Sequence, residues 1–259
     1  MKKLQLAKAN KLRLMIYGKP GSGKTTLCGT AGLDDRTMPV LHIDLGGNPE
    51  ALAKMPKLPN VTVLQPDRLE DLNDVYDWLT ADQPLDKHLA KKYDLTQQYK
   101  TVIFDGFTDM QRQSFDMIMG KTDAPFFTSY PRREFKEYYF VLQQTVHMIA
   151  KLRELDTIHI IVTALEHSKT LGDSTVSWTY ASPMLDGEAK REVPGYALTV
   201  MRMRPVTAVD PSIVKRLGAR YTIGSVFEDR YQYGKDQAGV NFDYLADPTI
   251  TKILDSINS

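Results

Sequence analysis

Residues 18–25 read Gly18-Lys19-Pro20-Gly21-Ser22-Gly23-Lys24-Thr25, which fits the phosphate-binding pattern G-x-x-x-x-G-K-[ST] at every fixed position. An apolar run over residues 12–17 precedes this loop, and residues 25–28 can open a helix. Glycines let backbone N–H groups turn toward phosphate oxygens, and the helix N-terminus adds the positive end of its dipole. We therefore expect residues 18–26, which end at Thr26, to bind the phosphates of ATP.

Two further side chains complete the predicted site for ATP and Mg²⁺. In such loops the lysine reaches the β- and γ-phosphates and the hydroxyl residue ligates the metal, which assigns these roles to Lys24 and Thr25. Residues 101–105 read Thr-Val-Ile-Phe-Asp, a strand-forming run that ends in an acid. Asp105 is therefore the predicted Walker B aspartate, which holds Mg²⁺ through a water molecule.

The remaining apolar runs predict an α/β fold with a mainly parallel central sheet. Residues 40–44 and 158–163 read as buried strands, and residues 132–155 carry the three- and four-residue spacing of an amphipathic helix. Functional groups collect at the carboxyl ends of parallel strands. Asp44 and Glu166 follow such ends, so we count both among the candidate catalytic residues. Residues 197–203 and 220–226 predict additional edge strands near the C-terminus.

The composition fits one domain over residues 1–259, with a basic arm at 1–11 and a tail at 235–259 that holds a short helix. The net charge of +1 argues neither for nor against nucleic acid. A single cysteine excludes an internal disulfide framework and a cysteine-based zinc site. No apolar run reaches the length of a membrane span, so we expect no membrane partner and a cytoplasmic location.

Residues 168–194 form a long polar stretch with two possible interpretations. Trp178 and Tyr180 lie among Ser, Thr and Gly, and the basic residues nearby are Lys169, Lys190 and Arg191. Aromatic faces beside cations suit stacking against single-stranded bases, and long loops in compact domains are often functional. The alternative is a surface hairpin whose aromatic side chains pack against the body.

The order of these segments resembles the RecA-like P-loop ATPase core. Within that superfamily the chain looks closest to the phage-encoded single-strand annealing and recombination group, because of residues 17–25 and the late Glu228-Asp229-Arg230. The resemblance covers residues 12–234, although only the phosphate loop is highly specific. It implies a sheet in which the strand at 158–163 lies between the phosphate-loop strand and the Walker B strand. If the chain is phage-encoded, its location is the cytoplasm of the host cell.

The resemblance also implies ATP bound between the subunits of a homo-oligomer, ring or filament, and single-stranded DNA bound by two loops, at residues 107–127 and 168–194. Arg230 would reach the γ-phosphate of the neighbouring subunit. RecA-type proteins carry a glutamate two residues after the aspartate of the second strand, and here that position is Gly46. Either hydrolysis is weak, or Asp44, Glu50 or Glu166 takes over this role.

The sequence thus predicts an ATP-binding RecA-like protein that binds single-stranded DNA, acts in recombination or strand annealing, and hydrolyses ATP. One alternative is a nucleotide-gated binding or assembly module with little hydrolysis. The other is a P-loop nucleotide or small-molecule kinase, which would need a second substrate pocket and an arginine-bearing lid.

Overall fold

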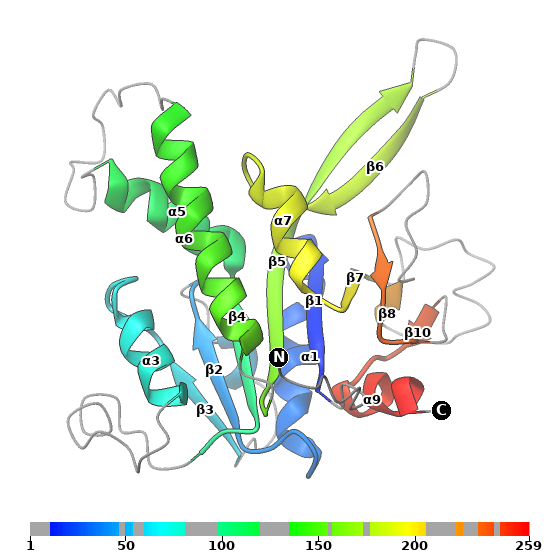
Figure 1. Cartoon of the computed structure of the whole chain (residues 1–259). Helices are drawn as coiled ribbons and strands as arrows, with labels where there is room; N and C mark the ends of the chain where they lie inside the picture. Colours follow the sequence, from blue (N-terminus) through cyan, green and yellow to red (C-terminus); the bar gives the residue numbers. More distant parts are fainter. Residues whose placement is uncertain are drawn as a thin grey trace, which may run out of the picture.

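The computed structural model of the chain is shown in Figure 1. It describes residues 11–46, 50–53, 60–80, 98–119, 135–154, 157–172, 177–205, 221–224, 233–240 and 244–258. Residues 1–10 of the predicted basic arm at 1–11, residues 81–97 and Arg230 lie outside the described residues.

A mainly parallel sheet forms the centre of the molecule, in the order β10-β8-β7-β1-β5-β4-β2-β3. Its strands are β1 (Arg13–Gly18), β2 (Val40–Asp44), β3 (Val61–Leu64), β4 (Thr101–Asp105), β5 (His159–Gly172), β7 (Thr199–Pro205), β8 (Tyr221–Gly224) and β10 (Tyr244–Ala246). Strands β3, β2, β4, β5, β1 and β7 run parallel to one another, whereas β8 is antiparallel to β7 and β10. The predicted fold class is confirmed, including β5 between β1 and β4 and the added edge strands.

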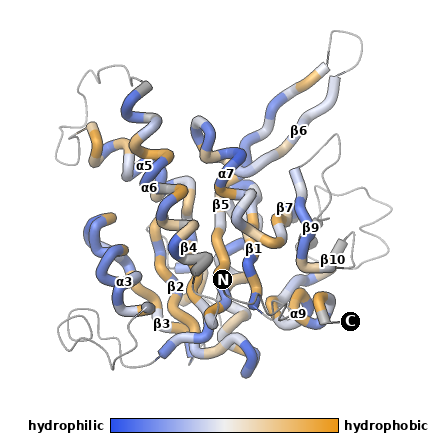
Figure 2. Tube along the Cα trace, in the orientation of Figure 1, coloured by the Kyte–Doolittle hydropathy of each residue, from blue (hydrophilic) through white to orange (hydrophobic). Residues whose placement is uncertain are grey.

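Helices cover both faces of this sheet (Figures 1 and 2). They are α1 (Lys24–Gly29), α2 (Glu50–Ala53), α3 (Asp71–Thr80), α5 (Phe107–Ile118), α6 (Phe135–Glu154), α7 (Ala189–Tyr196), α9 (Ile250–Asn258) and the 3₁₀ helix η1 (Thr30–Leu33). Within the described part of the chain, no helix is long and apolar enough to cross a membrane.

Strand β1 explains why the core has two halves. Its residues are buried on both faces, as expected for a central parallel strand, and they alternate between two clusters. Leu14 and Ile16 pack with α1 and α9, while Met15 and Tyr17 pack with residues of α3, α5 and α7. The tail helix α9 is fixed to the body by Ile250, whose N–H donates to the Thr30 hydroxyl at 2.9 Å.

Two segments that the RecA-like resemblance assigned to DNA-binding loops have regular structure instead. Residues 107–118 of the first predicted loop form helix α5, capped by Gly106 at φ 102°. In the second, β5 continues to Gly172 and pairs with the antiparallel strand β6 (Ser177–Pro183), and α7 follows. The prediction of a loop over 168–194 is therefore wrong, because alternating Thr, Trp and Tyr residues pair across the strands and satisfy the backbone hydrogen bonds.

The buried His159, at the start of β5, predicts a pH dependence of stability. Its Nδ1 accepts the Leu12 N–H at 2.9 Å, so the folded state requires the neutral ring. Burial, with the positive charges of Lys11 and Arg13 adding to it and Asp34 opposing it, lowers the pKa of His159 to about 4. The unfolded chain, with a His pKa of about 6.5, therefore binds the extra proton between these values.

The contribution of His159 to the free energy of unfolding is fully present above about pH 6.5 and is lost as the pH falls toward 4. Each pKa unit corresponds to 1.36 kcal/mol, so the loss can reach roughly 3 kcal/mol. Urea unfolding of the wild type and His159→Gln at pH 7.5 and pH 5 measures this loss. We expect a smaller drop for His159→Gln, and an unchanged drop for the control His147→Gln, because His147 is exposed on α6. Equal drops in wild type and His159→Gln would contradict the assignment.

Candidate nucleotide-binding site

The phosphate loop connects the end of β1 to the start of α1 and is shaped by glycines that no other residue could replace without strain. Gly21 and Gly23 have φ of 72° and 93°, in the left-handed region that side chains disfavour. At Gly18 a Cβ atom would lie 2.4 Å from the Met203 carbonyl oxygen of β7. The sequence pattern therefore builds the compact turn that phosphate binding requires, supported from behind by β7.

Lys24 extends back across this loop. Its Nζ donates to the carbonyl oxygens of Gly18 at 2.9 Å and Lys19 at 3.1 Å. Burial lowers the pKa of Lys24 below its ordinary value, and the nearby Asp105 opposes that shift. A desolvated ammonium at the mouth of the loop is well placed to exchange two carbonyl partners for phosphate oxygens.

Asp105 is held rigidly at the carboxyl end of β4. One carboxylate oxygen accepts a hydrogen bond from the Thr163 hydroxyl, and the other lies 3.2 Å from His42 Nε2. Burial alone would raise the pKa of Asp105, but hydrogen bonds from His42, Thr163 and Thr25 outweigh burial, and the pKa is lowered. The carboxylate is therefore ionised at neutral pH. Sequence reasoning had not found His42, because its partner lies on another strand.

The residues present fit a nucleotide-bound Mg²⁺ ion. The Thr25 hydroxyl is among the groups that lower the pKa of the Asp105 carboxyl, so the two predicted oxygen ligands lie near each other. Among the described residues, no group of three or more His, Cys, Asp or Glu side chains could hold a metal alone. Mg²⁺ usually keeps several waters and binds through one or two protein oxygens plus substrate phosphates, so the two oxygens of Thr25 and Asp105 suit it.

Asp44 lies beside Asp105, because the two residues are register partners at the ends of β2 and β4. Its Oδ1 accepts the Gly46 N–H at 3.2 Å, and the residue as a whole is only 5 % exposed. Its Oδ2 is buried and has no hydrogen-bond partner among the described residues. Asp44 also lines a polar cavity of about 260 Å³ at this edge of the sheet.

Glu166, which the sequence placed after a strand end, lies within β5 because this strand continues to Gly172, and it is held in an ion pair. Arg202 of β7 donates to both carboxylate oxygens at 2.8 and 2.9 Å, and the Ser168 hydroxyl donates at 2.9 Å. Burial would raise the pKa of Glu166, but the hydrogen bond and charge of Arg202 prevail and lower it. Arg202 was not predicted as a site residue, because only the parallel pairing of β7 with β1 brings it beside the loop.

The structure brings together three of the five predicted DNA-binding residues. Lys169 faces Tyr180 and Leu171 faces Trp178 across the β5–β6 hairpin, so all four side chains belong to one face of it. The hairpin projects beyond the body of the molecule (Figure 1).

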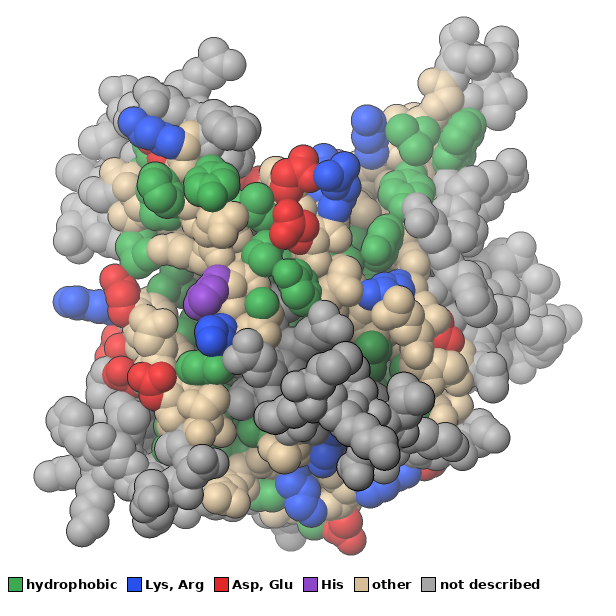
Figure 3. All heavy atoms as spheres, viewed as in Figure 1, with side chains coloured by type: hydrophobic (Ala, Val, Ile, Leu, Met, Phe, Trp, Pro, Cys, Tyr) green, Lys and Arg blue, Asp and Glu red, His purple; other side chains and the backbone are tan. Residues whose placement is uncertain are grey.

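Lys190 and Arg191 are exposed on helix α7 instead, where Arg191 pairs with Glu188 at 2.7 Å. Figure 3 shows charged side chains of both signs gathered at this part of the surface, between the hairpin and α5–α6. The two cations therefore lie on a different element from Trp178 and Tyr180, and Arg191 has an acidic partner there.

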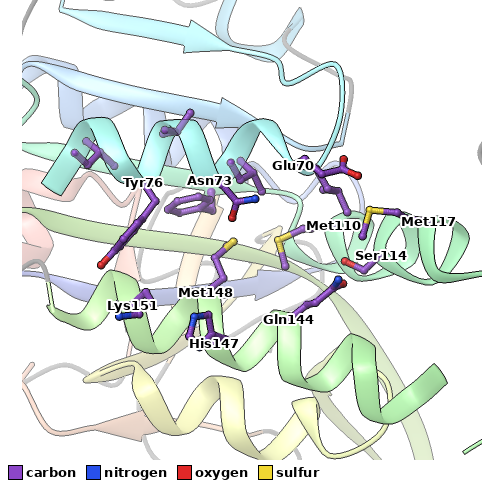
Figure 4. Close-up of a pocket in the computed structure, with 15 residues that line it drawn as sticks. Glu70, Asn73, Tyr76, Met110, Ser114, Met117, Gln144, His147, Met148 and Lys151 are labelled. Carbon is purple, nitrogen blue, oxygen red and sulfur yellow. The ribbon is translucent and has the colours of Figure 1, made fainter. Parts of the chain in front are cut away.

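A second cavity, of about 270 Å³, lies between α3, α5 and α6 (Figure 4). Met110, Met117 and Met148 contribute to its apolar lining, with Gln144 and Lys151 among its polar residues. None of the residues of the phosphate loop lines it, nor does Asp105. Helix α5 separates this cavity from the polar cavity at Asp44, which is lined by other residues of the same helix.

Several solved structures are similar to the chain at low sequence identity. The crystal structure of the RadB recombinase is 15% identical, with a TM-score of 0.44, and the match covers 87% of this chain and 84% of that one. A prototypical ATPase from the type III secretion system of pathogenic bacteria is 16% identical, with a TM-score of 0.41, over 79% of this chain and 53% of that one. The assembled ATPase EscN from enteropathogenic E. coli is 17% identical, with a TM-score of 0.41, over 75% and 43%.

No curated protein sequence matches the chain. A family model described as an AAA domain matches residues 10–227, which include the phosphate loop, Asp44, Asp105 and the β5–β6 hairpin. The match covers most of the chain and contains the whole nucleotide site described above. The chain therefore belongs to this AAA domain family of P-loop ATPases.

Proposed function

We propose that the protein is a Mg²⁺-dependent ATPase that binds single-stranded DNA and acts in recombination or strand annealing, like the phage-encoded RecA-like group that it resembles. The observation that supports this best is the path of β5. This strand lies between β1 and β4, and it continues without a break into the hairpin that carries Lys169, Trp178 and Tyr180. One strand thus connects the nucleotide site with a surface suited to bases.

The nucleotide side of the proposal uses residues 18–26 as the phosphate cradle. Lys24 neutralises the β- and γ-phosphates, and Thr25 and Asp105 hold Mg²⁺, which when bound offsets the negative charge that develops on the transferred phosphoryl group. Thr163 donates to Asp105 and accepts the Gly106 N–H at 2.9 Å, so β5 is tied to the proposed metal ligand at a point within the strand, before the hairpin. A change at the phosphates can therefore reach β5 through Thr163.

The DNA side of the proposal uses the exposed hairpin face. Trp178 and Tyr180 are half-buried and Lys169 is exposed, so rings and charge are both accessible there. Aromatic faces stack on any base, and a lysine nearby neutralises the backbone. Lys190 and Arg191 on α7 supply further positive charge beside the hairpin.

Replacing Trp178 and Tyr180 together by alanine should weaken single-strand binding by roughly 1–3 kcal/mol for each stacked base. Fluorescence anisotropy of a labelled oligonucleotide, titrated at several salt concentrations, measures this loss. A matched control is the pair Tyr139→Ala and Phe140→Ala, because these rings on α6 are also exposed, at 50% and 54%. If the Trp178/Tyr180 variant binds the single-stranded oligonucleotide with wild-type affinity, the two rings do not stack on bases and the hairpin has a structural role only.

The proposal includes a homo-oligomer with ATP bound between subunits. In that arrangement Arg230, which lies outside the described residues, reaches the γ-phosphate of a neighbour, and its planar guanidinium can hold two phosphate oxygens at once. Glu166 remains a proposed catalytic-site residue, although its pairing with Arg202 favours a role in which the pair responds to the γ-phosphate together.

A second candidate function is a nucleotide-gated binding module, and the observation that favours it is Gly46, which cannot act as a base. The two candidates differ in one measurable property. Tight Mg²⁺-dependent ATP binding with no phosphate release, with or without single-stranded DNA, would identify the binding module.

A further inference from the structure

We propose that Asp109 of helix α5 supplies the carboxylate that orients the attacking water, across Gly46 from Asp44. This inference rests on the proposed ATPase function, and it assigns a residue that the sequence did not suggest. Gly46 lies two residues beyond Asp44 at the end of β2, and Asp109 lies in the first turn of α5 after β4.

A close contact between two glycines places Asp109 over Gly46. A Cβ atom on Gly106 would lie 2.9 Å from the Gly46 nitrogen, so only glycine at 106 lets the two backbones approach this closely. Gly106 also has φ 102° and is the N-cap residue of α5. The first turn of α5 is therefore held directly against the end of β2, beside the register pair of Asp44 and Asp105.

The carboxylate of Asp109 points at the position of the missing side chain. A Cβ built on Gly46 would have two nearest neighbours, Asp109 Oδ2 at 3.5 Å and Asp44 Oδ1 at 3.9 Å. Arg112, one turn along α5, donates to Asp109 Oδ1 at 3.2 Å, which leaves Oδ2 directed toward Gly46. The space where the glutamate of RecA-type proteins would begin is thus flanked by two carboxylates from other positions.

The surroundings suit a water molecule held between these carboxylates. Asp44 and Asp109 both line the polar cavity of about 260 Å³, and so do Gln65 and Gln113. Asp44 Oδ2 is buried with no hydrogen-bond partner among the described residues, so it has an acceptor to offer. Asp109 is partly exposed, at 32%, and can pass a proton on to solvent.

The other acids are less well placed for this role. Both oxygens of Glu166 are bonded to Arg202. Glu50 is exposed on α2, and it is not among the residues that line the cavity. Asp44 lies beside the metal ligand Asp105 and is bonded to the Gly46 N–H, which suits it to hold the water rather than to receive its proton.

In the proposed step, a lone pair of the water oxygen forms the new bond to the γ-phosphorus. The bond from that phosphorus to the β,γ-bridging oxygen breaks, and its electron pair leaves with ADP. The proton of the water goes to the Asp109 carboxylate and from there to solvent. Asp109 is therefore assigned as a catalytic residue that touches the reacting water.

The first test compares wild type, Asp109→Asn and Asp116→Asn by single-turnover phosphate release, with ATP affinity measured separately by calorimetry. General-base catalysis is typically worth 10²–10⁴-fold, so Asp109→Asn should lower the rate at least about 100-fold while ATP affinity changes less than about threefold. Asp116 lies on the same helix and lines the same cavity, and Asp116→Asn should keep the wild-type rate. Equal rates in wild type and Asp109→Asn would reject the role of Asp109 but leave the proposed ATPase function intact. A wild type that binds ATP but releases no phosphate would reject both the role of Asp109 and the proposed hydrolysis.

The second test uses the geometry without relying on activity. Residue 46 lacks a positive φ, and an added Cβ meets nothing closer than 3.5 Å, so Gly46→Ala and Gly46→Glu should both fold. Gly46→Glu brings a second carboxylate against Asp109, and we expect a lower Tm that the added Asp109→Asn restores. Additive Tm changes at the two positions would reject the placement.

The same substitutions also allow a test by phosphate release. Gly46→Glu combined with Asp109→Asn should release phosphate at least about tenfold faster than Asp109→Asn alone, because a carboxylate again reaches the water. Gly46→Ala combined with Asp109→Asn adds bulk without charge and should give no recovery. Equal recovery by alanine and glutamate, or none by glutamate, would contradict the role of Asp109.

Discussion

The Lys24→Ala variant is expected to lose ATP turnover below detection while it keeps its fold. Lys24 donates to two loop carbonyls at 2.9 and 3.1 Å and is the one cation of the phosphate-loop pattern that reaches the β- and γ-phosphates. Its ammonium is desolvated, with a lowered pKa, so alanine removes a buried charge rather than core packing. A phosphate-release assay measures the loss of turnover, a calorimetric ATP titration measures the accompanying loss of affinity, and circular-dichroism melting checks the fold.

A matched control is Lys100→Ala, because Lys100 is exposed and donates to the Asp35 carbonyl oxygen away from the loop. We expect this control to bind ATP as the wild type does. Wild-type ATP affinity in Lys24→Ala, with a normal melting curve, would mean that the loop does not bind the nucleotide.

Asp105→Asn is expected to lower Mg²⁺-dependent turnover at least 100-fold, since metal stabilisation of the transition state is worth several kcal/mol and each 1.36 kcal/mol is a factor of ten. Asparagine keeps the shape of the side chain, so the hydrogen bond from Thr163 can persist. What it removes is the negative charge, held by His42, Thr163 and Thr25, that attracts the metal ion. ATP binding should persist but should no longer strengthen when Mg²⁺ is added.

Titrations of ATP with and without Mg²⁺ measure this change, with Asp77→Asn on the exposed face of α3 as the control. The same Mg²⁺ enhancement in Asp105→Asn and wild type would remove Asp105 from the metal site. Loss of ATP binding in both conditions would instead indicate a folding defect, which the melting curve would reveal.

The turn of the phosphate loop and the strand that ends at Asp105 could be predicted because each depends on local sequence. Fixed glycine spacing dictates a turn, and an apolar run that ends in an acid dictates a buried strand with a functional end. The resemblance to RecA-like proteins then supplied the order in which those strands assemble. The helix at 132–155 was likewise predicted from its periodicity and is found at Phe135–Glu154.

The hairpin and the carboxylates of the site could not be predicted so well. Trp178 and Tyr180 alternate with small polar residues, and only pairing with residues 169–171 decides between strand and loop. Arg202 meets Glu166, and Asp109 meets Gly46, through contacts between elements far apart in the sequence.

The central claim is that this chain couples ATP hydrolysis to single-stranded DNA. Steady-state phosphate release by the wild-type protein, measured with Mg²⁺ in the presence and absence of single-stranded DNA, tests it most directly. We predict a rate that depends on Mg²⁺, rises several-fold with single-stranded DNA and disappears in Lys24→Ala. A rate that single-stranded DNA leaves unchanged but that a nucleoside monophosphate stimulates would contradict the account and identify a kinase instead.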